Sequence, residues 1–212
     1  MQNGLIVFLN GTSSSGKTSI SKELIRITNH DFMHISVDRF SEGLIQSYIE
    51  MFPKFKEIME DNNDKTNEIL SPPVVKLFYE TIKYFAVIGK CVIVDSLIVG
   101  EEQMSECLES IGDLNVIFVG VQCPLEELER RELARGDRHI GLAKSQYAHI
   151  HSHGEYDLTV NTYDSSIQEC AEEILAFINS NKVGSAFQKL KENMKADKVM
   201  KNTSSNNIKV TS

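Results

Sequence analysis

The 212-residue sequence contains no tryptophan, and none of its apolar runs is long enough to span a bilayer. Its four cysteines form no C-x-x-C pair, which favours buried free thiols in a reducing cytosol. Basic residues are not in excess, and the net charge of −8 argues against a general nucleic-acid-binding protein. The start of the chain, MQNGLIVFLNG, lacks the basic residues and the small-residue cleavage site of a signal peptide. We therefore expect a cytoplasmic protein that binds neither membranes nor nucleic acid.

Apolar runs alternate along the chain with stretches of helical periodicity. Five runs are continuously apolar, as is typical of strands in a parallel sheet whose two faces are both buried. Their sequences are GLIVFLN, DFMHISVD, KCVIVDSLIVG, LNVIFVGVQC and YDLTVNT. Helical spacing is found at Ser19–Thr28, Val74–Ile88, Gln103–Ile111, Leu125–Arg135 and Ile167–Ile178. The alternation predicts an α/β fold, a doubly wound domain of three layers with a parallel sheet in the middle.

Two segments depart from this pattern. Residues 42–67 are less regular, and EDNNDK within them is typical of an exposed loop. The last part of the chain is rich in lysine, and its end, NTSSNNIKVTS, has the composition of a disordered segment. The apolar residues of this part that can share one helical stripe are Ala186, Phe187, Leu190 and Met194. We nevertheless expect a solvated, loosely packed appendage, so that residues 1–181 form the domain and residues 182–212 a basic, partly disordered tail.

Directly after the first apolar run, the segment GTSSSGKT fits the pattern G-x-x-x-x-G-K-[ST] and precedes a helical stretch. A loop that wraps a polyphosphate must turn its backbone N–H groups inward, and Gly11 and Gly16 lack the Cβ atoms that would obstruct this. The following helix adds free N–H groups and the positive end of its dipole. We expect Lys17 to reach the β- and γ-phosphates of a nucleoside triphosphate and Thr18 to ligate Mg²⁺, whereas the alternative is a turn with an exposed lysine. The expected nucleotide-binding residues of this loop are Gly11, Thr12, Ser13, Ser14, Ser15, Gly16, Lys17 and Thr18.

Two aspartates follow apolar runs and suit phosphoryl transfer. Asp38 ends the run in ISVDRF, and a carboxylate at the carboxyl end of a strand faces the crevice where α/β folds bind ligands. There it can accept a proton from an acceptor hydroxyl, although a helix cap or a structural aspartate linked to Mg²⁺ fits the spacing equally well. Asp95 follows four apolar residues in CVIVDS, an arrangement that favours a ligand of Mg²⁺ or of its water. A helix cap is the alternative for Asp95 as well.

The segment ERRELARGDRHIGLAKSQ combines a helix, a glycine that ends it and several arginines. Arginines beside a glycine hinge suit a lid that closes over the transferring phosphoryl group and excludes water. We assign Arg135 and Arg138 to such a lid and leave Arg130 on the surface. The alternative is a charged surface helix with Glu–Arg pairs four residues apart, and Glu127 with Arg131 has this spacing.

Five motifs of the chain carry a family resemblance: NGTSSSGKTS, SVDRF, VIVDSLIVG, VGVQCPLEELERRELARGDRHIGLAKSQ and HGEYDLTVNT. Together they resemble the chloramphenicol phosphotransferase-like family of P-loop kinases, over roughly Leu5 to Ile178. The resemblance implies a five-stranded parallel sheet of nucleoside-kinase type. It also implies an enzyme that uses ATP and Mg²⁺ to phosphorylate a hydroxyl of a small molecule.

Carried over motif by motif, the resemblance implies roles for individual residues. Asp38 becomes the general base toward the acceptor hydroxyl. Lys17 and Thr18 hold phosphate and Mg²⁺, and Arg135 and Arg138 are phosphate or lid arginines.

The chain departs from the family at two places. The loop after the last strand is implied to lie close to the adenine at Thr162, but Asn161 stands where an aspartate is expected and receives no catalytic role. Between Phe40 and Val74, where the acceptor pocket is expected, the chain lacks the family's glycine-rich acidic stretch. Kinase chemistry therefore carries over better than the acceptor, and no local feature favours chloramphenicol itself. The alternatives are a kinase of a nucleotide sugar or another metabolite, and a nucleotide-binding switch protein without an acceptor.

Overall fold

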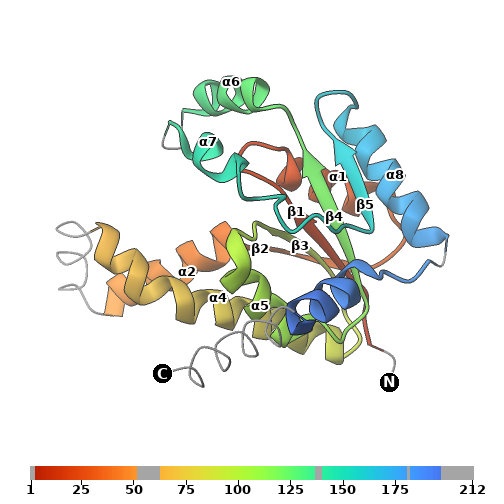
Figure 1. Ribbon diagram of the computed structural model, residues 1–212, viewed down its shortest axis with the longest axis horizontal. Coiled ribbons are helices and arrows are strands. Elements are labelled where there is room, and N and C mark those ends of the chain that lie inside the picture. Colours follow the sequence, from red (N-terminus) through yellow and green to blue (C-terminus); the bar gives the residue numbers. More distant parts are fainter. Residues whose placement is uncertain (1–2, 52–62, 137–139, 181, 197–212) are drawn as a thin grey trace, which may run out of the picture.

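The computed structural model describes residues 3–51, 63–136, 140–180 and 182–196. At its centre lies a sheet of five parallel strands in the order β2–β3–β1–β4–β5 (Figure 1). The strands are β1 Ile6–Asn10, β2 Phe32–Ser36, β3 Cys91–Ser96, β4 Val116–Gln122 and β5 Leu158–Asn161. The predicted α/β fold with a five-stranded parallel sheet is thereby confirmed.

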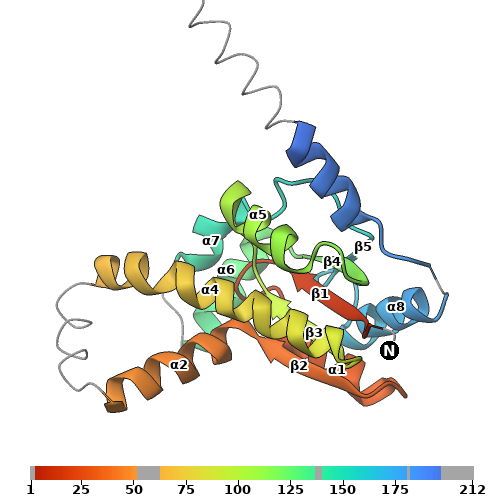
Figure 2. The same cartoon turned by 90° about the horizontal axis from the view of Figure 1, so that it is seen from below.

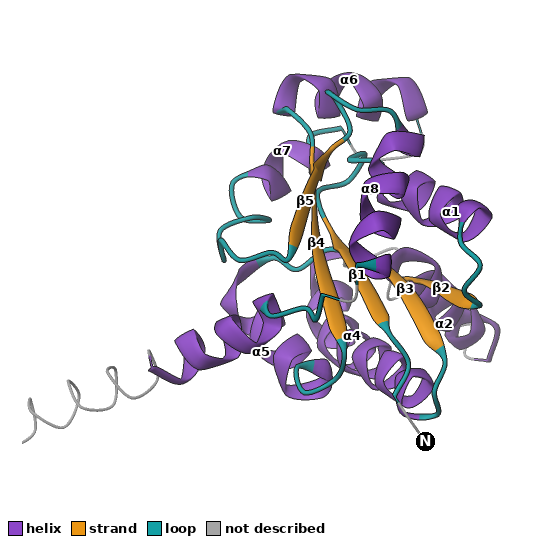
Figure 3. Cartoon of the chain, turned by 90° about the vertical axis from the view of Figure 1, so that its right-hand side faces the viewer, coloured by secondary structure: helices purple, strands orange, loops and turns teal. Residues whose placement is uncertain are grey.

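Helices cover both faces of the sheet and extend beyond its carboxyl edge. They are α1 Lys17–Ile27, α2 Val37–Met51, α4 Asn63–Val87, α5 Gly100–Ile111, α6 Leu125–Arg135, α7 Leu142–Tyr147 and α8 Ile167–Asn179. Helices α1 and α8 pack together on one face, whereas α4 and α5 cover the other (Figure 2). Helices α6 and α7 follow β4 and lie beyond the carboxyl ends of the strands (Figure 3).

Strand β1 explains why the fold has three layers. Ile6 and Phe8 belong to the hydrophobic cluster under α4 and α5, whereas Val7 and Leu9 belong to the cluster under α1 and α8. All four side chains are fully buried. A strand covered on both faces needs apolar residues at every position, which is why the runs in the sequence are continuous. The last residue of the strand, Asn10, leads directly into the loop of residues 11–16, called the glycine loop below, at the edge of the sheet.

Residues 186–196 form a further helix that packs on the same face as α4 and α5. Its Phe187 is buried, with its ring centroid 4.8 Å from that of Phe118 on β4. The carboxylate of Asp157 accepts hydrogen bonds from two backbone N–H groups at the start of this segment, at 2.6 and 2.9 Å. The expectation of a loosely packed appendage is therefore wrong for this helix, because its apolar stripe joins the core. Residues 197–212 lie outside the described residues, so the disorder expected there stays a prediction.

The segment after β2 also differs from the prediction. The strand ends at Ser36 and α2 begins at Val37, so Asp38 lies in the first turn of a helix and not at the end of a strand. Helix α4 begins at Asn63, earlier than the expected start at Val74. The irregular pattern of the sequence in this region thus conceals two helices.

Two observations bear on the composition of the chain. All four cysteines are free thiols; Cys107, Cys123 and Cys170 are buried and Cys91 is half-buried. In the part of the chain that the structure describes, no helix combines the length and the apolar character needed to cross a membrane.

Candidate active site

A cavity of about 620 Å³ opens where the strands of the sheet end. Its walls come from the loop after β1, the first turns of α1 and α2, the end of β3, helices α6 and α7 and the loop after β5. The predicted site residues that line it are Ser13, Ser14, Gly16, Lys17, Thr18, Asp38, Arg135 and Thr162. Four further predicted site residues do not line the cavity but form hydrogen bonds with residues that do: Gly11, Thr12, Ser15 and Asp95. Open α/β sheets bind their ligands at this edge, so the cavity is the candidate active site.

The loop between β1 and α1 has the geometry of an anion cradle. Ser14 and Gly16 have φ angles of 63° and 95°, in the left-handed region that reverses the direction of successive N–H groups. The Lys17 Nζ folds over the loop and donates to its first two carbonyl groups, at 2.9 and 2.8 Å. The hydroxyls of Ser14 and Ser15 are buried and have no hydrogen-bond partner among the described residues. A loop of this shape at a helix N-terminus fits the oxygens of a polyphosphate.

Thr18 and Asp95 bring two oxygen atoms together beside this loop. The Thr18 Oγ1 donates to the Oδ2 of Asp95, which is buried at the end of β3, over 2.5 Å. Burial raises the pKa of Asp95, but nearby His34 and Lys17 and the hydrogen bond from Thr18 outweigh it, so that the pKa lies below its usual value. Asp95 is therefore ionised at neutral pH.

These two oxygen donors fit Mg²⁺, which prefers hydroxyl, carboxylate, water and phosphate oxygens. Among the described residues, no group of three or more His, Cys, Asp and Glu side chains could hold a metal ion by itself. Kinase sites commonly bind Mg²⁺ through one or two protein groups together with the substrate phosphates, so a pair such as Thr18 and Asp95 suffices.

Asp38 reaches the same cavity from α2. Because the helix begins at Val37, Asp38 is a first-turn residue and does not precede the helix as an N-cap would. Asp38 lines the cavity together with Lys17 and Thr18.

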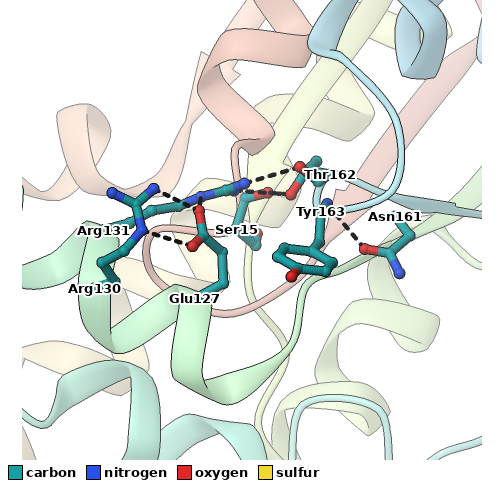
Figure 4. A network of polar contacts seen from close by, with 7 residues as sticks. All are labelled: Ser15, Glu127, Arg130, Arg131, Asn161, Thr162 and Tyr163. Atoms are coloured by element: carbon teal, nitrogen blue, oxygen red, sulfur yellow. Dashed lines mark hydrogen bonds and ion pairs between the residues drawn. The ribbon is translucent and has the colours of Figure 1, made fainter.

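Arg131 connects α6 to the loop after β5 through hydrogen bonds (Figure 4). Its Nη1 and Nη2 donate to the Oγ1 and the carbonyl oxygen of Thr162, at 2.9 and 2.8 Å, and its Nε donates to Glu127 at 2.7 Å. The Thr162 hydroxyl in turn donates to the carbonyl of Ser15 in the glycine loop, at 2.9 Å. The Glu127–Arg131 pair, which supported the alternative interpretation of a charged surface helix, is thus one end of a chain of hydrogen bonds to the glycine loop.

The other arginines of this segment have different positions. Arg135 lines the cavity, whereas Arg138 lies outside the described residues. Arg130, which we left on the surface, is 69% exposed but also lines the cavity. Two hydrogen bonds from Arg130 and one from Arg131 lower the pKa of Glu127 to about 2, so this carboxylate stays ionised and holds both guanidinium groups.

Sequence reasoning missed two residues that fasten α7 to its surroundings. Glu132 is 1% exposed, and its carboxylate accepts hydrogen bonds from two backbone N–H groups at the start of α7, at 2.7 and 2.9 Å. The side chain of Gln146 on α7 accepts from the backbone N–H of Ser13 at 2.7 Å. A signal for Glu132 was present, because it lies four residues after the buried Leu128 and therefore on the inner face of α6.

Sequence reasoning also missed a second polar network, which surrounds Asn10 at the end of β1. The fully buried Asn10 donates to the Tyr156 hydroxyl at 2.8 Å and accepts from the backbone N–H of Ile98 at 2.8 Å. The Nδ1 of His151 lies 2.6 Å from the same tyrosine hydroxyl. Burial lowers the pKa of the adjacent His153 to about 4, so this ring is neutral at physiological pH. The network braces the end of β1 against the segments that follow β3 and α7.

Comparison with known proteins gives the site a context. Residues 4–179 match the family described as "Chloramphenicol phosphotransferase-like protein". A Mycobacterium tuberculosis protein named "Putative O-phosphotransferase" is 28% identical over 202 residues, which cover 91% of this chain and 90% of that protein. The guanylate kinase of Clostridium tetani is 29% identical over 192 residues, covering 86% and 88%. The structure of the M. tuberculosis APS kinase in complex with AMPPNP and APS superposes with a TM-score of 0.60 at 18% identity, covering 84% of this chain and 99% of that one, which shows a common fold.

Proposed function

The chain belongs to the chloramphenicol phosphotransferase-like family, and from this premise we propose that it is a cytoplasmic, ATP- and Mg²⁺-dependent kinase that phosphorylates a hydroxyl of a small molecule. One observation carries the proposal. A single cavity is lined both by the glycine loop with Lys17 and Thr18 and by Asp38 from another element, α2. A protein that only binds a nucleotide needs the first set of groups and not the second.

In this proposal the loop residues and Lys17 hold the β- and γ-phosphates of ATP. Thr18 and Asp95 would hold Mg²⁺, which supplies positive charge to the phosphate oxygens when bound. Phosphoryl transfer passes through a loose transition state, so positioning and electrostatic stabilisation provide most of the rate. The fixed N–H groups and Lys17 provide both.

Asp38 is the proposed general base. The acceptor hydroxyl gives its proton to the Asp38 carboxylate while its oxygen forms a bond to the γ-phosphorus, and the bond to the β,γ-bridging oxygen breaks to release ADP. The products are the phosphorylated acceptor, ADP and a proton that Asp38 later returns to water.

The two lid arginines form the third part of the proposed machinery. Arg135, with Arg138, is assigned to stabilise the charge that spreads over the transferred oxygens. Thr162 is assigned to the adenine side of the cavity, where it is held by Arg131. A closed α6–α7 segment also excludes water that would otherwise hydrolyse ATP.

The test is a transfer assay with [γ-³²P]ATP and a panel of acceptors. The panel contains chloramphenicol and other neutral alcohols, nucleotide sugars and GMP, and the labelled product is separated from inorganic phosphate. Label on an alcohol supports the proposal. Label only in inorganic phosphate, with every acceptor present, contradicts it and favours a nucleotide-binding switch protein.

The similarity to a guanylate kinase makes GMP an informative member of this panel. A phosphate acceptor is already ionised at neutral pH and needs no general base, whereas an alcohol does. Transfer to GMP that survives Asp38→Asn would therefore replace the proposed alcohol kinase by a nucleotide kinase.

A further inference from the structure

His34 lies on β2, beside the carboxylate assigned to Mg²⁺. Strand β2 pairs with β3 so that Ser36 is level with Asp95, and His34, two residues before Ser36, is level with Ile93. The His34 Nε2 is 3.8 Å from the Oδ2 of Asp95, and the side chain of His34 is 13% exposed. The Nε2 atom itself is buried and has no hydrogen-bond partner among the described residues. A buried ring nitrogen without a partner is unfavourable unless it serves a neighbouring group.

That neighbouring group is the buried carboxylate of Asp95. Asp95 is 5% exposed, and its Oδ2 already accepts the hydrogen bond from Thr18. A carboxylate oxygen has two lone pairs, so Oδ2 can accept a second hydrogen bond. A shift of about 0.6 Å brings Nε2 and Oδ2 from 3.8 Å to the ~3.2 Å limit of an N–H···O hydrogen bond.

We propose that His34 is a positioning residue for Asp95: its Nε2–H donates to Oδ2 and holds the carboxylate in the orientation that suits Mg²⁺. The inference rests on the proposed function, because it assumes that Asp95 serves Mg²⁺·ATP. Groups that orient metal-binding side chains in this way typically contribute 10- to 100-fold to metal affinity or activity.

The experiment separates metal coupling from nucleotide binding. The Kd of a fluorescent ATP analogue is measured with Mg²⁺ and with EDTA. The Kd in EDTA divided by the Kd in Mg²⁺ reports how strongly Mg²⁺ promotes binding. His34→Leu keeps the volume of the side chain and removes the donor, whereas His34→Gln keeps an N–H donor. His30→Ala is the matched control, because His30 is an exposed histidine just before β2.

We expect His34→Leu to lower this ratio about tenfold while the Kd in EDTA stays unchanged. His34→Gln should retain most of the ratio, and His30→Ala all of it. Should His34→Leu fail to fold, as judged by its melting temperature, His34→Ala replaces it as the variant without a donor.

Each other outcome overturns the inference. If both Kd values rise together in His34→Leu, the residue has only a structural role. If His34→Gln loses as much as His34→Leu, the donated hydrogen bond is not what matters. If the unaltered protein shows no promotion by Mg²⁺, the proposed use of Mg²⁺ fails first, and this result is distinguishable because it appears without any substitution.

Discussion

The two sides of the cavity are held in different ways. On the side of the glycine loop, side chains from α6, from α7 and from the loop after β5 form hydrogen bonds with backbone groups. Thr162 and Gln146 bond to the backbone of the glycine loop, and Arg131 bonds to the backbone of Thr162. On the side that we propose for the acceptor, the described lining residues are Val37, Asp38, Ser96 and Leu97. Hydrogen bonds between side chains and backbone connect the elements of the first side, whereas the residues of the proposed acceptor side come from the start of α2 and the end of β3.

The two sides of a kinase site recognise different kinds of group. Phosphate groups are the same in every kinase, so a backbone cradle serves them all. Acceptors differ, and the side chains that select them change with the substrate. From the sequence we expect the acceptor pocket between Phe40 and Val74, but no described residue of that range lines the cavity. Substitutions on the two sides should therefore affect different kinetic constants.

The largest effect is expected on the phosphate side, at Lys17. Lys17→Ala removes the positive charge nearest to the proposed β- and γ-phosphates, so kcat should fall by on the order of 10²–10³. Transfer is measured with labelled ATP, and circular dichroism verifies the fold. Lys22→Ala is the control, because Lys22 is an exposed lysine of the same helix. A folded Lys17→Ala protein with normal turnover would refute the nucleotide site.

The acceptor side is tested by Asp38→Asn. Asparagine is nearly isosteric but cannot take a proton, so kcat should fall by roughly 10² or more while the Kd for ATP and the Tm stay the same. A loss of Mg²⁺ and ATP affinity together with kcat would instead identify Asp38 as part of the metal site. Glu42→Gln, an exposed change on the same helix, should leave all three quantities unchanged. An unchanged kcat in Asp38→Asn would remove this residue from the catalytic set.

A smaller effect is expected at Arg135, the last residue of α6. Arg135→Ala should lower kcat about tenfold and change the Kd for ATP less, because its contacts are expected to strengthen in the transition state. The decrease stays below the ~10²–10³ of a fixed donor because Arg138 is assigned to the same lid. Arg26→Ala is the control, an exposed arginine that pairs with Glu23 within α1. Equal kcat values for Arg135→Ala and the unaltered protein would leave the surface-helix interpretation in place.

The sequence predicted those parts of the molecule that depend on local patterns. Continuous apolar runs are enough to predict a parallel sheet, and G-x-x-x-x-G-K-T is enough to predict the phosphate loop. It did not predict the packing of Phe187, because an apolar stripe does not say that distant strands supply the surface that buries it. It also missed Gln146, whose partner is a backbone N–H group that no sequence motif displays. Contacts between a side chain and distant backbone are invisible until the fold is known.

The smallest effect is expected at Glu132, which acts on the phosphate side only through α7. Glu132→Gln removes the charge and replaces one of two acceptor oxygens by an amide that faces a backbone N–H group. Losing a buried acceptor costs about 1–3 kcal/mol, and a protein of this size loses about 2–4 °C in Tm for each kcal/mol. Because α7 carries Gln146 to the glycine loop, the KM for ATP should rise while the KM for the acceptor stays constant. Calorimetry and steady-state kinetics measure both, with the exposed Glu126→Gln as the control. An equal rise in the two KM values would mean that α6 and α7 support both sides of the cavity alike, and the contrast between the two sides would then be smaller than the hydrogen bonds indicate.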